Sequence, residues 1–356
     1  MEKQGVAILG DSFISGNIYG VQRFAYEILR ELDNMDLPIK IVIVVPQFAK
    51  VEVQFSNFEI VRYGNIKNPF LWRQICFPVF IKKNNYIGVD MTLGLPYFKC
   101  DIVCLHDCTY ENFKDNFKTI KEKLRRKSYL VRAKHLIKKS KAVITVSETS
   151  KKELVKYYKV RSEKIYVIYN AWQHYNRIEE DDSIFEKIGI NKNEKFFFSL
   201  GSGLAHKNIL WIVRAAIKNP NYKFVITGTD KFSSYFESIG IDSVKNVIYT
   251  GYIPDAQVKA LMKNANVFIH PAFCEGFGIP PLEALSTGTK IMVSNTSCLP
   301  EIYEKSAIYI DPYQYDIHID EIITENVDID NIKYILDKYS WKKSAEKFAK
   351  ILEELL

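Results

Sequence analysis

The chain has 356 residues, of which 47% are apolar and 26% are charged, and its formal net charge is +7. This length exceeds what one ordinary hydrophobic core fills and indicates two domains, and the composition is that of a folded globular protein. No apolar run reaches the roughly 18 residues that a transmembrane helix needs. The first residues read as a β-strand and not as a signal peptide, so we expect a cytoplasmic protein.

The first half of the chain alternates between apolar β-branched runs and amphipathic segments. We expect strands at residues 6–9, 39–45, 101–105, 141–146 and 165–169, a helix at 21–32, and short strands and loops between 50 and 90. The loop at residues 10–20 holds three glycines between a strand and a helix. This geometry lets backbone amides approach a phosphate, although the G-x-G-x-x-G dinucleotide fingerprint is missing.

Two segments of the first half combine apolar and basic residues. The aromatic stretch from Phe70 to Ile81 is interpreted as core packing, with a lipid-facing surface as the alternative. Residues 118–141 hold eleven Lys or Arg and one Glu, with apolar residues at roughly helical spacing, which predicts a basic amphipathic helix or helix pair. Such a face binds an anionic membrane or nucleic acid, or is simply solvated. We favour the membrane and do not expect nucleic-acid binding.

His106 lies at the carboxyl end of a predicted strand, where ligands bind in parallel sheets. A histidine there can donate or accept a proton near neutral pH. Three cysteines, at positions 100, 104 and 108, surround it, but their spacing lacks the paired Cys-x2–4-Cys pattern of zinc sites. We therefore interpret the cysteines as core or loop residues and expect no metal.

The second half repeats the strand and helix alternation after a polar, acid-rich segment at residues 172–194. Expected strands are 196–201, 224–227 and 247–250, and expected helices are 209–216, 258–262 and a final helix after Ser340. Lys207 directly precedes one of these helices, where the helix dipole disfavours a cation. A bound phosphate would resolve that conflict.

The most informative stretch runs from residue 266 to residue 295. It predicts a strand at 267–269, a glycine loop, a helix that begins at Pro280-Pro281, and a strand at 291–293. The amides at the start of this helix form an anion site. Glu275 precedes the helix and Glu283 is expected in its first turn, where a carboxylate can accept from vicinal hydroxyls. This combination suits a nucleotide or sugar phosphate; alternatively, Glu283 favours the helix dipole and Glu275 is solvated.

The run EGFGIPPLEALSTG resembles the signature of the retaining GT-B glycosyltransferases of family four, also called glycosyl transferases group 1. Its hallmark is two glutamates separated by seven residues, which Glu275 and Glu283 match, and the similarity extends over residues 251–312. The resemblance implies two Rossmann-like domains that face each other across a cleft. Residues 1–170, completed by 340–356, would bind the acceptor and residues 171–339 the donor. The last helix would cross back to the first domain, with Trp341 as its packing anchor.

The resemblance also implies roles for individual residues. Lys207 would bind phosphate, although Ser202, Gly203 and Leu204 stand where many members carry an arginine. Glu275 would orient the donor sugar, Glu283 would bind the ribose diol, and His106 would contact the sugar. The other residues implied in donor binding are Gly20, Tyr252, Gly276, Phe277, Gly278 and Ile279.

The predicted function is retaining transfer of a hexose-type sugar from a nucleotide-sugar donor to a hydroxyl of a glycan or lipid-linked acceptor, as in surface polysaccharide assembly. No Asp-x-Asp motif occurs in a suitable strand-end loop, so we expect no metal and no cofactor. The protein would be cytoplasmic, with peripheral binding to the inner face of the membrane through 118–141. The alternatives are a sugar-nucleotide epimerase, a phosphorylase, and a non-catalytic subunit that binds membrane or a partner transferase.

Overall fold

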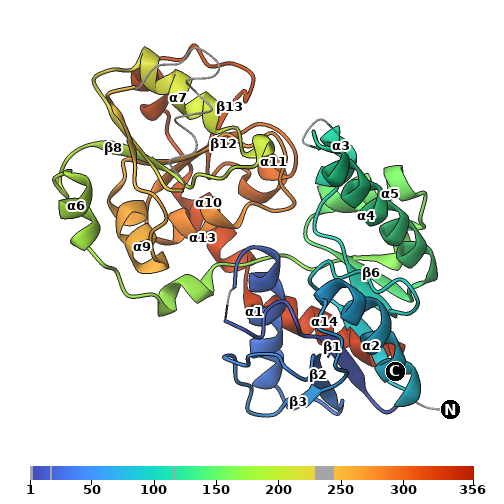
Figure 1. Ribbon diagram of the computed structural model, residues 1–356. Helices are drawn as coiled ribbons and strands as arrows, with labels where there is room; N and C mark the ends of the chain where they lie inside the picture. The colour runs from blue at the N-terminus through green and yellow to red at the C-terminus, as the bar shows by residue number, and fades with distance from the viewer. Residues whose placement is uncertain (1–2, 17, 115–116, 229–243) are drawn as a thin grey trace. The chain divides into compact units, whose positions relative to one another are not determined.

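The computed structural model describes residues 3–16, 18–114, 117–228 and 244–356 (Figure 1). The chain divides into two compact units, one of Met1–Asn170 with Ser340–Leu356 and the other of Ala171–Tyr339. Each unit contains one parallel β-sheet flanked by helices. The assignment of acceptor binding to the first unit and donor binding to the second stays a prediction.

The sheet of the first unit has seven parallel strands in the order β3-β2-β1-β4-β5-β6-β7. The chain reverses its direction of progress across the sheet between β1 and β4, and ligands of open α/β sheets bind where such a reversal occurs. The strands are β1 Val6–Leu9, β2 Ile41–Val45, β3 Glu59–Arg62, β4 Ile87–Asp90, β5 Ile102–Cys104, β6 Ala142–Thr145 and β7 Ile165–Val167.

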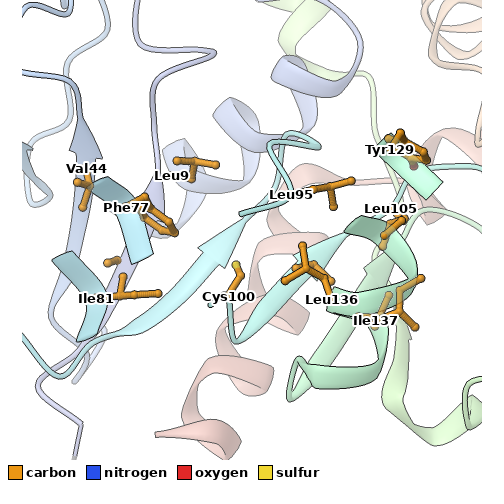
Figure 2. Packing of buried hydrophobic residues seen from close by; sticks show 14 of the residues in the cluster. Leu9, Val44, Phe77, Ile81, Leu95, Cys100, Leu105, Tyr129, Leu136 and Ile137 are labelled. Carbon is orange, nitrogen blue, oxygen red and sulfur yellow. The ribbon is translucent and has the colours of Figure 1, made fainter. Parts of the chain in front are cut away.

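Helices cover both faces of this sheet, which explains why its central strands are apolar throughout. One buried cluster joins α2 and α4 to the face that carries Leu9, Val44 and Leu105 (Figure 2). Side chains alternate along a strand, so the buried residues between these, such as Ile8, face the opposite side. The helices are α1 Val21–Asp33, α2 Pro69–Lys83, α3 Thr109–Asn112, α4 Ile120–Lys139, α5 Glu148–Tyr158 and α14 Trp341–Leu355, with a 3-10 turn at Ser162–Lys164.

Residues 50–90 contain two of the expected short strands, β3 and β4, but the expectation is wrong for Pro69–Lys83, which form α2. Its sequence is apolar on all sides and contains Pro78, so neither a helical period nor an uninterrupted helix is visible in it. Asn68 caps the helix by accepting the Leu71 N–H at 3.1 Å. The aromatic stretch is divided between two environments: Trp72, Phe77, Phe80 and Ile81 are buried, whereas Phe70 and Leu71 are exposed.

The basic segment forms a single helix, α4, which begins with a capping box between Thr119 and Glu122. Its predicted apolar positions do not share one buried face. Leu136 is buried in the core, but Ile120, Leu124 and Val131 are 79%, 62% and 53% exposed. Within the described residues no helix is both long and apolar enough to span a membrane.

The final helix completes the first unit, as expected. Ser340 caps α14, and Trp341 is buried with its ring 6.5 Å from that of Phe24 on α1. The Ser344 hydroxyl also donates to the Tyr169 carbonyl at 2.7 Å. These contacts fix the last helix against the unit that contains the start of the chain.

The sheet of the second unit has six parallel strands in the order β10-β9-β8-β11-β12-β13, and the reversal lies between β8 and β11. The strands are β8 Phe196–Ser199, β9 Lys223–Ile226, β10 Val247–Tyr249, β11 Val267–His270, β12 Lys290–Ser294 and β13 Ile308–Ile310. The helices are α6 Ser183–Ile188, α7 Ile209–Lys218, α9 Asp255–Asn264, α10 Ile279–Ser286, α11 Leu299–Tyr303, α12 Ile319–Ile323 and α13 Ile329–Lys338, with 3-10 turns at Gln173–Arg177 and Ala205–Lys207.

Candidate functional site

Two loops of the second unit meet at its topological switch point. Strands β8 and β11 are paired neighbours, with Phe197 opposite Val267. The loop after β8 leads to Lys207, and the loop after β11 leads to Glu275. Because both loops leave the same edge of the sheet, the two predicted residues are brought together although 68 positions separate them in the chain.

Glu275 is the centre of a charged hydrogen-bonded group. Its Oε1 accepts from Lys207 Nζ at 2.5 Å and from His270 Nε2 at 2.7 Å, and all three side chains are mostly buried. Burial alone would raise the pKa of Glu275, but the Lys207 charge and the His270 hydrogen bond more than offset it, and the pKa lies well below its usual range. Glu275 is therefore an ionised acceptor at neutral pH and not a proton donor.

The backbone of Glu275 is held by Ser297. The Ser297 hydroxyl accepts from the Glu275 N–H at 3.1 Å and donates to the Glu275 carbonyl at 2.8 Å. Both described bonds to the carboxylate fall on Oε1, so Oε2 can accept from a ligand hydroxyl without breaking either. The arrangement orients one carboxylate oxygen and positions the loop that bears it.

The glycine loop ends in a helix start whose amides can receive an anion. α10 begins at Ile279, and Gly278 immediately before it has a φ of +85°. A Cβ at Gly278 would lie 2.8 Å from Leu299 Cδ2, and the Tyr303 hydroxyl donates to the Gly278 carbonyl. The turn is thus fixed by a left-handed residue that has no space for a side chain.

We expect Gly278→Ala to lower the free energy of unfolding by about 1–3 kcal/mol, because it combines a left-handed backbone with a steric clash. Urea unfolding of the full chain measures this value. Gly203→Ala is the matched control, since a Cβ at Gly203 would meet no atom within 4 Å. Equal stability of the two variants would contradict the role given to Gly278.

Glu283 lies in the second turn of α10 and not in the first, because the helix starts at Ile279 and its first turn contains no acidic residue. Its Oε1 is 2.7 Å from Nε2 of His174, whose side chain is almost fully buried. The imidazole belongs to the 3-10 turn Gln173–Arg177. This contact fixes the direction of the carboxylate, and the partly exposed side chain keeps an oxygen for a ligand.

The remaining predicted donor residues of the second unit differ in accessibility. Tyr252 follows β10 and is 72% exposed, next to Gly251 with a φ of +70°. Phe277 is buried, with its ring 5.1 Å from that of Tyr339. Tyr252 can therefore offer its ring to a ligand, whereas only the backbone of Phe277 can reach one.

The first unit contains the other two predicted residues. His106 is buried edge-on against Phe24, and its Nε2 donates to the Met91 carbonyl at 3.2 Å. Burial lowers the pKa of His106, so the ring is neutral at pH 7 and its Nδ1 is an acceptor. Gly20 precedes α1 with a φ of +45°, and a Cβ there would meet no atom within 4 Å. Backbone conformation, and not close packing, explains this glycine.

The cysteines near His106 are core residues. Cys100, Cys104 and Cys108 are all buried, and Cys104 Sγ lies 3.5 Å from His106 Nε2. Burial raises the pKa of the Cys100 and Cys104 thiols well above their usual value, so both thiols stay protonated at neutral pH.

Sequence reasoning missed His270 and His174. His270 is the last residue of β11, and the strand-end criterion applied to His106 would have selected it too. His174 gave no comparable signal, because it lies in an irregular segment 109 positions from Glu283. Its contact depends on how the linker returns to the second sheet.

Comparison with known families supports the resemblance. The profile of the family described as "Glycosyl transferases group 1" matches residues 180–323, and that of "Glycosyltransferase Family 4" matches residues 18–172. The second unit of the chain belongs to the group 1 glycosyltransferases. Among solved structures of this fold, sucrose-phosphate synthase from Thermosynechococcus elongatus superposes with a TM-score of 0.76 at 13% identity and covers 99% of both chains. The chain thus has the two-domain GT-B fold.

Two further proteins are similar to this chain. The O-antigen chain mannosyltransferase RfbU of Salmonella typhimurium is 28% identical over 222 residues, which are 61% of this chain and 58% of RfbU. The matched region thus spans less than two thirds of that relative's length. Anabaena HepE, solved in complex with UDP-glucose, has a TM-score of 0.69 at 15% sequence identity. The match covers 98% of this chain and 99% of HepE.

Proposed function

We propose that this protein is a retaining glycosyltransferase that moves a hexose-type sugar from a nucleotide-sugar donor to a hydroxyl of a glycan or lipid-linked acceptor in surface polysaccharide assembly. The observation that supports it most is the Lys207–Glu275–His270 group beside the N-terminus of α10. In this group a cation, oriented backbone amides and a carboxylate that can accept hydrogen bonds from hydroxyls lie at one switch point of the sheet. The similarity to an O-antigen mannosyltransferase supports the acceptor class.

In the proposed reaction, the bond from the sugar C1 to the leaving phosphate oxygen breaks as a bond from C1 to the acceptor oxygen forms on the same face. The acceptor proton goes to the departing phosphate. Lys207, the amides of residues 276–279 and the α10 dipole stabilise the charge on the leaving nucleoside diphosphate without a metal. Glu275 fixes the sugar through its hydroxyls, and a carboxylate already bound by two donors is a poor nucleophile.

Other residues are assigned to donor recognition. Glu283 accepts from the two ribose hydroxyls, with His174 holding its orientation. Tyr252 lies along the base, and His106 accepts a sugar hydroxyl through Nδ1. The exposure of Tyr252 and the hydrogen-bond acceptor atoms of Glu283 and His106 support these roles.

A panel of nucleotide sugars tests the proposal. We expect the melting temperature of the full chain to rise with one nucleotide sugar and with its nucleoside diphosphate, because a ligand that binds only the folded state stabilises it. The responding donor should then be consumed only when a glycan or lipid-linked acceptor is added. Release of nucleotide without an acceptor would favour an epimerase, and no shift with any donor would favour a non-catalytic subunit.

A further inference from the structure

A cavity of about 470 Å³ lies in the first unit, and none of the site residues assigned above lines it. It is bounded by α2, by α4 and by the loop that follows β4. Arg73 of α2 and Arg125 and Arg132 of α4 line it, together with the polar groups of Thr92, Tyr110 and Ser128. No acidic residue lines it within the described parts of the chain. The lining is therefore cationic and rich in donors.

The loop side of the cavity is built by a buried carboxylate. Asp90 ends β4 and accepts the amide protons of Thr92, Gly94 and Leu95 at 2.9, 3.2 and 2.6 Å. These three backbone N–H groups stabilise the buried carboxylate of Asp90. In the resulting turn, the carbonyls of Gly94 and Leu95 face α4. Arg132 Nη1 donates to both carbonyls, at 3.0 and 3.3 Å. The Arg132 guanidinium is thus held in one orientation.

Arg132 nevertheless forms no direct ion pair with a described residue, and Asp90 is the nearby negative charge that acts on it. Its Nε is buried with no hydrogen-bond partner among the described residues, and its guanidinium lies 5.1 Å from the Phe70 ring. Burial lowers the pKa of Arg132 and the nearby Arg73 lowers it further, although Asp90 opposes them. A desolvated cation beside a second cation is stabilised by an anion that accepts from its free N–H groups.

The other two arginines differ in whether a carboxylate neutralises their positive charge. Arg73 Nε donates to the buried Asp11 at 2.7 Å, which leaves its terminal nitrogens for another acceptor. Arg125 is exposed and forms no ion pair with a described residue. Planar guanidinium groups that converge on one space suit phosphate, because each can donate two parallel hydrogen bonds.

Exposed apolar side chains also lie on α2, the helix that carries Arg73 of the cavity. Phe70 lines the cavity, and Leu71, Ile75 and Val79 are exposed further along the helix. Ile75 and Val79 also line a second hollow of about 560 Å³ with Phe98, which is 73% exposed. A cationic cavity and exposed apolar side chains on the same helix match a molecule with a phosphorylated head and a hydrocarbon chain.

We propose that the three-arginine cavity binds the phosphate or diphosphate of a lipid-linked acceptor, and that the hydrocarbon chain lies along the exposed side of α2. This assignment rests on the proposed transferase function and specifies its acceptor. Arg132 supplies a cation that is fixed in one orientation, and Arg125 supplies an exposed cation that can adjust to the phosphate. The side chains that would contact the lipid are those of Phe70, Ile75, Val79 and Phe98.

Binding of farnesyl diphosphate to the full chain tests the assignment by calorimetry. We expect Arg125→Ala to weaken binding by about tenfold or more, as the loss of a charge-assisted hydrogen bond does. Lys127→Ala, which removes the same charge from an exposed position on α4 outside the cavity, should change affinity by less than about twofold. Farnesol, which lacks the diphosphate, should bind more weakly to the wild type and equally to both variants.

Three outcomes would overturn the assignment. Equal weakening by Arg125→Ala and Lys127→Ala, with the same loss on vesicles containing phosphatidylglycerol, would indicate general surface charge. Loss of farnesyl diphosphate binding in Lys207→Ala but not in Arg125→Ala would place the compound in the donor site. Absence of wild-type binding would refute the subsite even if nucleotide sugars bind. Failure of nucleotide sugars to bind would instead refute the proposed function, so the two failures are distinguishable.

Discussion

Glu275→Gln should lower kcat by about 10²–10³-fold, while the nucleoside diphosphate binds as tightly as before or more tightly. The amide keeps the shape of the carboxylate but removes the charge that holds Lys207 and accepts the sugar hydroxyls, so the sugar loses its orientation. Lys207 then has no carboxylate at 2.5 Å and is free to interact with phosphate. Single-turnover kinetics and calorimetry with the nucleoside diphosphate measure the two effects separately.

Lys207→Ala is the complement of this variant and should act in the opposite direction on binding. It removes the cation assigned to the leaving group, so both donor affinity and kcat should fall. Lys218→Ala, at the far end of α7 and paired with Asp316 on the surface, is the matched control. A kcat within about threefold of the wild type for both Glu275→Gln and Lys207→Ala would remove the Lys207–Glu275 pair from the mechanism.

Glu283→Ala should raise the donor KM by about 10–100-fold, because a ribose diol would lose the carboxyl group that accepts its hydrogen bonds. A double cycle, in which the Glu283 side chain and the ribose hydroxyls are each removed, isolates the contact between them. The wild type should bind a nucleoside diphosphate about 10–100-fold more tightly than its 2′,3′-dideoxy analogue, and Glu283→Ala should bind the two with nearly equal affinity.

Two comparisons make the Glu283 cycle specific. Glu186→Ala removes an exposed glutamate from α6 in the same unit and should leave the preference for the diol intact. His174→Ala should weaken that preference only in part, since it releases the orientation of the carboxylate and not its charge. An undiminished diol preference in Glu283→Ala would assign the ribose to another residue.

The strands were predictable because the sequence of a buried parallel strand is an unbroken run of apolar residues. Residues 6–9, 267–270 and 290–294 form strands close to the expected limits, and Ser340 is the N-cap of the final helix, which was expected to follow it. In these places local propensity and tertiary burial favour the same conformation.

Helix α2 could not be predicted in the same way. Its buried and exposed sides are both apolar, so the usual periodic contrast is absent, and Pro78 argues locally against a helix. The partners of the two glutamates were hidden for a different reason. His174 and His270 reach Glu283 and Glu275 through side-chain contacts, which the residue pattern around each glutamate does not contain.

The proposed function requires the negative charge of Glu275 to lie close to a site for phosphate. The sequence suggested a carboxylate beside an anion site, which by itself would repel phosphate. The structure pairs that carboxylate with Lys207 and His270 through Oε1, so Oε2 keeps its capacity to accept a hydrogen bond. The anion site and the sugar-orienting group can therefore coexist at the start of α10.

The configuration of the product tests the account most directly. The responding nucleotide sugar is incubated with the full chain and a lipid-linked acceptor, and nucleotide release, the mass of the product and its anomeric configuration by NMR are measured together. The account predicts one glycosylated acceptor per nucleoside diphosphate released, with the anomeric configuration of the donor sugar. An inverted anomer, or nucleotide release with free or epimerised sugar and no glycosylated acceptor, would contradict it.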